Sequence, residues 1–298
     1  MSEFIGTKLT MNLGERSYDI IVKSGSLENL YQFARLDRRV AVVTDSGVPA
    51  QYAQMVADQC KDAHIITVPQ GEASKSFKIL ESVLKQMLEF GMGGGMGMLL
   101  LALAVIAVGG GVVGDLAGFA ASIYMRGIDF INCPTTTLSM IDSSIGGKTA
   151  VDLGDTKNIV GAFWQPKLVI VDPDTLATLP RRHFINGLAE AVKASLLADP
   201  ELFAIFENGD VDAQIGEIIC RSLRFKKNIV EQDETEQGMR KALNFGHTIG
   251  HGIEAVKGVK GRRTVGLYHG ECVALGMLPM IESKALQKRV RAVYRRLG

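Results

Sequence analysis

Three of the five histidines in this chain, His247, His251 and His269, lie within 23 residues of one another. The first two are four residues apart in Asn-Phe-Gly-His-Thr-Ile-Gly-His, and residues with this spacing lie on the same face of a helix. Imidazole nitrogens that converge in this way can bind one divalent metal ion. A catalytic metal site also needs a carboxylate or similar third ligand and a coordination position that is open to substrate.

A carboxylate for such a site is present in the segment Gly-Leu-Ala-Glu190-Ala-Val-Lys193. Glu190 and Lys193 have the i, i+3 spacing that places them on one helix face, where the commonest arrangement is an exposed ion pair. The neighbouring residues are apolar, however, which predicts that the pair is buried. One Glu with two His is a familiar ligand set for an open zinc site, so we expect a metal centre here rather than histidines that only pack.

Several basic and amide side chains precede His247 in the sequence. Arg224, Lys226 and Lys227 share one helical segment, and Arg240 and Asn244 lie just before the first histidine. Beside a divalent cation, these groups would suit an anionic substrate that carries hydroxyls. The alternative is a helix face that only contacts solvent.

A glycine-rich turn between a strand and a helix marks a different kind of site. Gly109-Gly-Gly-Val-Val-Gly-Asp115 satisfies the pattern G-x-G-x-x-G, in which glycines let the backbone approach a diphosphate at a helix N-terminus. The acidic residue that usually follows about 20 positions later is absent, and Asp45 at the end of an earlier strand is the candidate for that role. The motif alone fits a tight strand–helix turn equally well.

Other polar turns supply further candidates. In Pro69–Lys75, Ser74 is expected to be an N-cap, and Pro134-Thr-Thr-Thr ends a strand with hydroxyls that can reach a phosphate or ribose. Asp142-Ser-Ser-Ile-Gly-Gly-Lys148-Thr lacks the P-loop spacing, which excludes that type of NTP hydrolysis, although Lys148 can still be a point charge for an anion.

The elements that must position these residues change character near residue 173. Before it, strands at Arg39–Asp45, His64–Val68, Val105–Val108, Asp129–Cys133 and Leu168–Val171 alternate with helices at Ser74–Phe90 and Asp115–Met125. This alternation predicts an α/β nucleotide-binding domain with a parallel, Rossmann-like sheet over residues 1–173. After it, amphipathic stretches such as 185–197 and 215–229 predict a mainly α-helical metal and substrate domain over residues 174–298.

Composition limits the classes of function. There are 33 basic and 32 acidic residues, which gives no global signal for nucleic acid or an anionic membrane. The apolar stretch 96–108 is shorter than a membrane span and is expected to form a buried strand. Four separated cysteines and the absence of a signal-like N-terminus predict reduced thiols in a cytoplasmic protein.

Taken in order, the motifs resemble those of the 3-dehydroquinate synthase family, the sugar-phosphate cyclases of the shikimate pathway. The resemblance extends from about residue 40 to 280 and rests on these segments: Gly109–Phe119, Tyr124-Met-Arg-Gly127, Pro134-Thr-Thr136, Asp142–Thr149, Lys157-Asn158, Gly187–Glu190, Leu243–His251 and His269-Gly-Glu271. It implies a lyase that binds NAD and zinc, with Co2+ or another divalent ion as alternatives. Such an enzyme converts 3-deoxy-D-arabino-heptulosonate 7-phosphate to 3-dehydroquinate and phosphate, through transient oxidation, β-elimination, re-reduction and aldol closure.

The resemblance also implies roles for individual residues. Zinc would be held by Glu190, His247 and His269. NAD would contact Asp45, Glu72, Lys75, Gly110, Gly111, Asp115, Thr135, Thr136, Lys157 and Thr178. Substrate would be held by Asp142, Lys148, Asn158, Lys193, Lys226, Arg240 and Asn244. His251 would lie near the reacting oxygens, and Arg126 would reach the site of a second subunit in a homodimer.

Some features depart from the family pattern. The stretch 91–107 is longer and more apolar, the interval from His247 to His269 is longer, and the chain ends at Gly298 where relatives continue, so that a short C-terminal domain is expected. Gly47 stands where Asn is usual, and His183 where Glu is usual. The alternatives are a related sugar-phosphate cyclase, a metal-dependent NAD polyol dehydrogenase that releases NADH, and a truncated inactive homologue.

Overall fold

A computed structural model describes residues 6–93, 103–256 and 266–298 of the chain. The chain divides into two compact units, Met1–Thr178 and Leu179–Gly298. The predicted fold class, an α/β unit followed by a mainly helical one, is confirmed.

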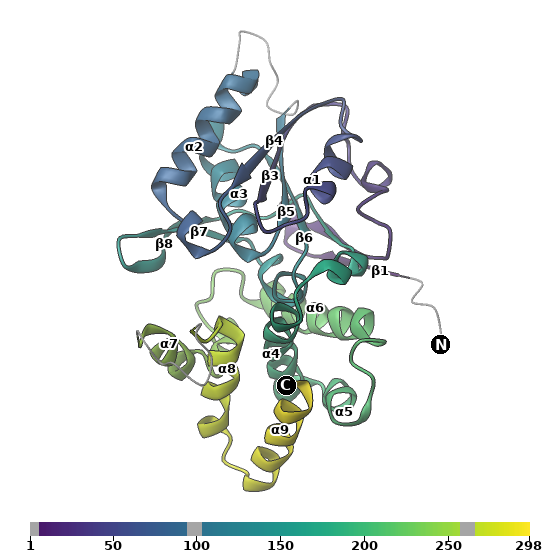
Figure 1. Cartoon of the computed structure of the whole chain (residues 1–298), viewed down its shortest axis with the longest axis vertical. Helices are drawn as coiled ribbons and strands as arrows, with labels where there is room; N and C mark the ends of the chain where they lie inside the picture. Colours follow the sequence, from purple (N-terminus) through teal and green to yellow (C-terminus); the bar gives the residue numbers. More distant parts are fainter. Residues whose placement is uncertain (1–5, 94–102, 257–265) are drawn as a thin grey trace. The chain divides into compact units, whose positions relative to one another are not determined.

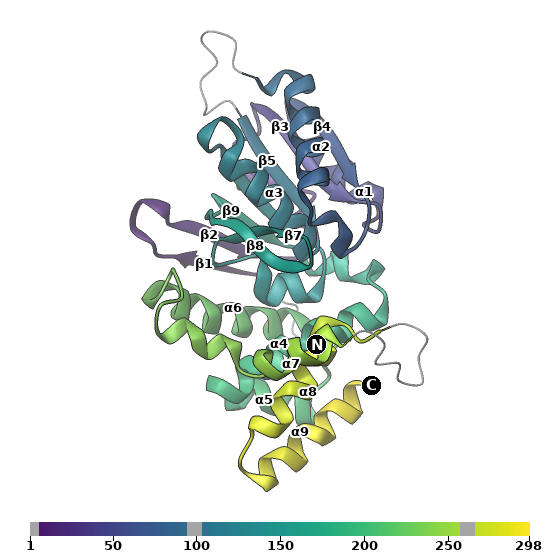
Figure 2. The same ribbon diagram turned by 90° about the vertical axis from the view of Figure 1, so that its left-hand side faces the viewer.

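The first unit is built on a seven-stranded sheet in the order β1-β2-β9-β6-β5-β3-β4, whose strands are labelled across Figures 1 and 2. All neighbouring strands are parallel except β1 and β2. The strands are β1 Thr7–Met11, β2 Tyr18–Val22, β3 Arg39–Asp45, β4 Asp62–Val68, β5 Leu103–Gly109, β6 Asp129–Pro134 and β9 Leu168–Val171. A separate antiparallel hairpin pairs β7 Lys148–Leu153 with β8 Thr156–Phe163.

Helices cover both faces of the central strands. Side chains alternate along a strand, so Val40 and Val42 of β3 pack with α1 (Ala50–Ala57) on one face. Ala41 and Val43 pack with α2 (Phe77–Met87) and α3 (Gly111–Ile123) on the other face (Figure 1). Burial on both faces explains why these strands read as continuous apolar runs.

Several details differ from the sequence-based expectations. The α3 helix begins at Gly111, so Asp115 lies inside it and not at its start. Ser74 is not an N-cap, because it belongs to a short turn at Glu72–Ser74 and its hydroxyl donates to Pro69 O. Strands β1, β2, β7 and β8 and helix α1 were not predicted. Residues 96–102 of the predicted apolar stretch 96–108 lie outside the described residues.

The second unit is helical. Its helices are α4 Arg181–Ala198, α5 Pro200–Asn208, α6 Ile215–Gln232, α7 His247–Ala255, α8 His269–Met277 and α9 Lys284–Leu297. Helix α4 packs on α5, α6 and α8, and Figure 2 shows it among them. It is therefore buried along both sides from Asn186 to Ser195, and the prediction of an amphipathic helix there is wrong. A central helix in a bundle is buried on all sides because it has no solvent face.

Two predictions about the whole chain concern its cysteines and its most apolar segment. All four cysteines are free thiols, and Cys133, Cys220 and Cys272 are buried. The described part of the apolar segment forms β5, which is fully buried. None of the helices in the described ranges has the length and apolar composition that a membrane span requires.

Candidate functional site

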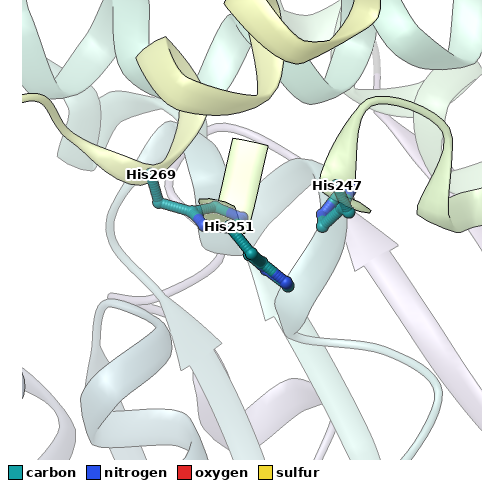
Figure 3. A group of neighbouring side chains, drawn as sticks. All are labelled: His247, His251 and His269. Carbon is teal, nitrogen blue, oxygen red and sulfur yellow. The ribbon is translucent and has the colours of Figure 1, made fainter. Parts of the chain in front are cut away.

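The three histidines converge in the second unit. His247 and His251 are one turn apart on α7, and His269 is the first residue of α8. One ring nitrogen from each lies within 4.8 Å of the others, and Figure 3 shows the three side chains directed toward a common space. Helices α7 and α8 approach closely because Gly250 and Gly276 lie at their contact, where an added Cβ at Gly276 would come 2.2 Å from Gly246 O.

The buried carboxylate of Glu190 faces two of these histidines. Its Oε1 lies 3.5 Å from His247 Nε2 and 3.9 Å from His269 Nε2, and the residue is only 2% exposed. Oε2 is paired with the ammonium of Lys193, and Oε1 has no hydrogen-bond partner among the described residues. Tetrahedral ligands about 2.1 Å from a zinc ion are about 3.4 Å from each other, so the two distances from Glu190 are near those between ligands of one divalent ion.

Two triplets of ligands share His247 and His269, and they differ in the third member. His251 belongs to the cluster of nitrogens but is exposed, whereas Glu190 is buried, with one oxygen paired to Lys193 and the other without a hydrogen bond among the described residues. A buried carboxylate is costly unless a cation or donors compensate it. Lys193 compensates Oε2, and Oε1 faces His247 and His269, so this geometry makes Glu190 a stronger candidate than His251 for the third ligand.

Two further groups surround Glu190. The ammonium of Lys193 forms a buried ion pair with Glu190 Oε2 and donates a hydrogen bond of 2.7 Å to Leu243 O. On α9, burial of the Tyr294 phenol raises its pKa above the ordinary value, and the nearby negative charge of Glu190 adds to this effect. Tyr294 was not predicted as a site residue, and no local motif indicates it.

Helix α4 holds the first turn of α8 through residues spaced four apart. Arg182 makes two charged hydrogen bonds to Glu271, of 2.8 and 2.7 Å, and Asn186 Oδ1 accepts one of 2.7 Å from Gly270 N. Glu190 follows one turn later on the same face and meets His269. Sequence reasoning missed Arg182 and Asn186, although their spacing from Glu190 was visible.

Glu254 is another group that sequence reasoning missed. Its Oε2 lies 3.1 Å from His269 Nδ1, on the side of the imidazole ring away from the Nε2 that approaches Glu190. The i+7 spacing from His247 on α7 was the available signal.

The residues of the predicted basic lining differ in their burial. Lys226 and Arg240 are buried, whereas Asn244 and Arg224 are exposed. The Arg240 guanidinium donates to Glu234 O, and Asn244 Nδ2 donates to Glu236 Oε1 at 3.2 Å. The Arg240 backbone N–H donates to Asp233 at 3.0 Å and lowers the pKa of that carboxyl.

In the first unit, the glycine turn opens α3 without a side-chain cap. Gly110 is the N-cap residue, and Gly111 is the first helical residue. A Cβ at Gly110 would lie 3.1 Å from Thr136 Cγ2, and one at Gly111 would lie 2.9 Å from Ser143 Oγ. An uncapped helix N-terminus between such close neighbours suits an anionic group such as a diphosphate.

A buried lysine links α3 to the β7–β8 hairpin. Lys75 Nζ lies 2.6 Å from Asp115 Oδ2 and also donates to Asn158 Oδ1. Asn158 adopts a positive φ of 55°, and its N–H donates to Asp152 Oδ1 at 2.7 Å. Three of the predicted contact residues, Lys75, Asp115 and Asn158, are therefore in one polar network.

The remaining predicted residues of this unit are more dispersed. Lys157 Nζ is 3.9 Å from Glu72 Oε1, both largely exposed, and Asp45 Oδ1 accepts from the N–H groups of Gly47 and Val48. Thr135 is buried directly after β6, the Thr136 hydroxyl is hydrogen-bonded to that of Ser139, and Thr178 Oγ1 is 3.0 Å from Tyr52 OH. Asp142 lies in a helical turn. Lys148, at the start of β7, and Arg126, with a φ of 68°, are both exposed.

Comparison with known proteins gives consistent matches over nearly the whole chain. The family described as 3-dehydroquinate synthase N-terminal matches residues 65–186, and the one described as 3-dehydroquinate synthase C-terminal matches residues 187–295. The 3-dehydroquinate synthase of Pelobacter propionicus is 42% identical over 283 residues, which cover 91% of this chain and 76% of that protein.

Solved structures of related cyclases also match. A 2-deoxy-scyllo-inosose synthase in complex with carbaglucose-6-phosphate, NAD+ and Co2+ superposes with a TM-score of 0.85 at 26% identity, covering 98% of this chain and 81% of that one. The 2-epi-5-epi-valiolone synthase of Streptomyces hygroscopicus, with NAD+ and Zn2+ bound, gives 0.81 at 30% identity, covering 96% and 82%.

Proposed function

Since the chain belongs to the 3-dehydroquinate synthase family, we propose that it is the lyase that converts 3-deoxy-D-arabino-heptulosonate 7-phosphate to 3-dehydroquinate and phosphate. The observation that carries this proposal is the buried Glu190 carboxylate, whose Oε1 has no hydrogen-bond partner among the described residues and lies 3.5 Å from His247 Nε2 and 3.9 Å from His269 Nε2. Such a group is expected where a catalytic cation is bound.

In this proposal Glu190, His247 and His269 hold one divalent ion, and the helical domain from residue 174 onward binds metal and substrate. Zinc or cobalt is suitable, because imidazole and carboxylate ligands accept both. The ions in the two cyclase complexes, Co2+ and Zn2+, support this choice.

NAD is assigned to the first domain, residues 1–173. Gly110 and Gly111 at the uncapped start of α3 would receive its diphosphate. The further contacts that we assign are Asp45, Glu72, Lys75, Asp115, Thr135, Thr136, Lys157 and Thr178, of which the last lies beyond that boundary. Lys75 also donates to Asn158 of the β7–β8 hairpin, so cofactor contacts and hairpin position depend on the same lysine.

The substrate's phosphate and carboxylate need cationic partners, and its hydroxyls need amide or carboxylate partners. For these roles we assign Lys148, Lys193, Lys226, Arg240, Asn158, Asn244 and Asp142. Buried Lys226 and Arg240 suit this role, because a cation in a poorly solvated site attracts an anion more strongly than an exposed one.

When bound, the metal supplies Lewis acidity to a substrate hydroxyl, and NAD accepts a hydride that it later returns. The transient ketone acidifies the adjacent C–H, so phosphate can leave by β-elimination. His251 is exposed and close to the other two histidines, and it is the side chain that we assign to proton transfer. The cationic residues hold the phosphate in the position from which it leaves.

We also infer a cytoplasmic homodimer. Free thiols at all four cysteines are typical of a reducing compartment. The β7–β8 hairpin exposes the apolar side chains Leu153, Ile159 and Phe163, which a second copy would cover. Exposed Arg126, with its positive φ, is the residue expected to reach the partner's site.

One assay tests the function. Phosphate release from the heptulosonate phosphate should require NAD, stop when a chelator removes the metal, and return with Zn2+ or Co2+, with no net NADH. Net NADH from a polyol without phosphate release would instead indicate a dehydrogenase. Release of phosphate that is unaffected by chelator would contradict the metal assignment.

A further inference from the structure

Glu254 lies on the same face of α7 as two members of the histidine cluster. His247, His251 and Glu254 have the spacing i, i+4, i+7, so that this face presents two imidazoles and one carboxylate to the start of α8. The Glu254 side chain is 22% exposed and that of His269 is 32% exposed. Both are therefore shielded enough from water for a fixed contact between them.

The imidazole of His269 lies between two carboxylates. Its Nδ1 is 3.1 Å from Glu254 Oε2, whereas its Nε2 is 3.9 Å from Glu190 Oε1. A neutral imidazole carries one N–H, and a carboxylate accepts hydrogen bonds but does not donate them. When Nδ1–H donates to Glu254, the lone pair of Nε2 faces the space beside Glu190.

We propose that Glu254 is a positioning residue for the metal centre, which it serves by fixing the tautomer and ring orientation of His269. This inference rests on the proposed function, because it assumes that His269 is a metal ligand. A carboxylate behind a ligand histidine also raises the basicity of that ligand.

The backbone of His269 is held from the opposite direction. Helix α4 anchors the next two residues, through Asn186 to Gly270 N and through Arg182 to Glu271. These contacts fix the start of α8 but leave rotation of the imidazole ring undetermined. Glu254 supplies the contact that determines it.

The Nδ1 of His247 lies near a backbone carbonyl oxygen. Its Nδ1 lies 3.4 Å from Phe245 O, which is long for a hydrogen bond. The two histidines should therefore differ, with the contribution of His269 to metal affinity depending on a carboxylate.

The test is a titration of the metal-stripped protein with Co2+, in which affinity and the visible absorption spectrum of the bound ion are both recorded. Glu254→Ala should weaken Co2+ binding about 10- to 100-fold and change the spectrum. Glu254→Gln should have a smaller effect, because its amide oxygen accepts the same hydrogen bond without charge.

The matched control is Glu207→Gln. The Glu207 side chain is also 22% exposed and pairs with Arg289 away from the histidines. This variant should bind Co2+ as the wild type does. Thermal unfolding of the metal-free proteins is measured as well. If Glu254 formed only a structural ion pair, Glu254→Ala would lower the unfolding temperature more than the control does.

A double-variant cycle separates the possible results. If Glu254 acts through His269, adding Glu254→Ala to His269→Ala should weaken Co2+ binding little further. Wild-type affinity and spectrum in Glu254→Ala would overturn the inference and leave the metal centre intact. Failure of the wild type itself to bind one Co2+ would overturn both, so the two failures are distinguishable.

Discussion

Glu190 and Lys193 form an ion pair one helical turn apart in α4, with their side chains only 2% and 4% exposed. The same carboxylate faces His247 and His269, so Lys193 is the positive charge that accompanies it in the metal-free protein.

We therefore expect Lys193→Met to destabilise the metal-free protein by about 3 kcal/mol, because the change leaves a buried carboxylate without its cation. Saturation with Zn2+ should recover part of that loss, since the metal provides a new counter-charge. Urea unfolding with and without metal measures both quantities. Lys227→Met is the control: its ammonium pairs with Glu231 at 2.8 Å in a more exposed position and should cost about 1 kcal/mol or less. Equal losses in both variants would contradict the role of Lys193.

His247→Ala and His251→Ala should separate metal binding from proton transfer. We expect His247→Ala to lose most of the affinity for Co2+, because it removes a ligand. His251→Ala should keep Co2+ affinity within about threefold but lower the rate of phosphate release about 10²- to 10⁴-fold. Metal titration and phosphate release are measured on both variants. If His251→Ala also loses the metal, the third ligand is His251 and not Glu190.

Gly110→Ala should weaken NAD binding. The added methyl would lie 3.1 Å from Thr136 Cγ2 and occupy space that a diphosphate needs at the start of α3. We expect the Kd for NAD to rise about tenfold, which equals about 1.4 kcal/mol. Isothermal titration with NAD measures the change. Gly252→Ala is a matched control, because a Cβ at Gly252 meets no atom within 4 Å. An unchanged Kd in Gly110→Ala would argue against this location for the diphosphate.

Cys60 should react slowly with alkylating agents in the native protein. Burial raises the pKa of its thiol from 9.0 to about 11, so the reactive thiolate is about tenfold to 100-fold less populated at pH 8 than in the unfolded chain. Because the folded pKa is the higher one, this thiol's contribution to stability is complete below pH 9 and is lost as the pH rises toward 11. Rates of iodoacetamide labelling, with and without urea, test the first statement. Cys60→Ala should make unfolding less dependent on pH in that window, and an unchanged pH dependence would contradict the second.

Leu153→Glu should shift the proposed dimer toward monomer. Leu153 is 55% exposed on the hairpin, and a charge there would be costly to cover with a second copy. Leu88→Glu is matched, since Leu88 is 58% exposed on another part of the unit and should leave the oligomeric state unchanged. Sedimentation velocity distinguishes these outcomes. A wild-type monomer, or a Leu153→Glu dimer as stable as the wild type, would remove the hairpin from the interface.

The sequence by itself determined the fold class and the family. Strands β3, β5, β6 and β9 are continuous apolar runs because both faces of the sheet are covered, so they were recognisable without knowing their neighbours. The spacing of His247 and His251 was likewise informative, because contacts at i, i+4 depend only on helix geometry. Elements without such a local signature, such as β1, β2 and the β7–β8 hairpin, were not predicted.

Only the tertiary structure decided which distant residues share a site. Glu190 and His269 are far apart in the chain, and they meet because α4 and α8 pack together at glycines and through Arg182 and Asn186. Burial also depends on packing between elements. Helix α4 has no solvent face because three helices pack on it, and Arg240 is buried whereas Asn244 is exposed. Periodicity reports on the face that an element buries, but the partner of that face depends on packing between elements, which no short segment encodes alone. For that reason the contact of Glu254 with His269 and the burial of Tyr294 near Glu190 could be found only in the folded chain.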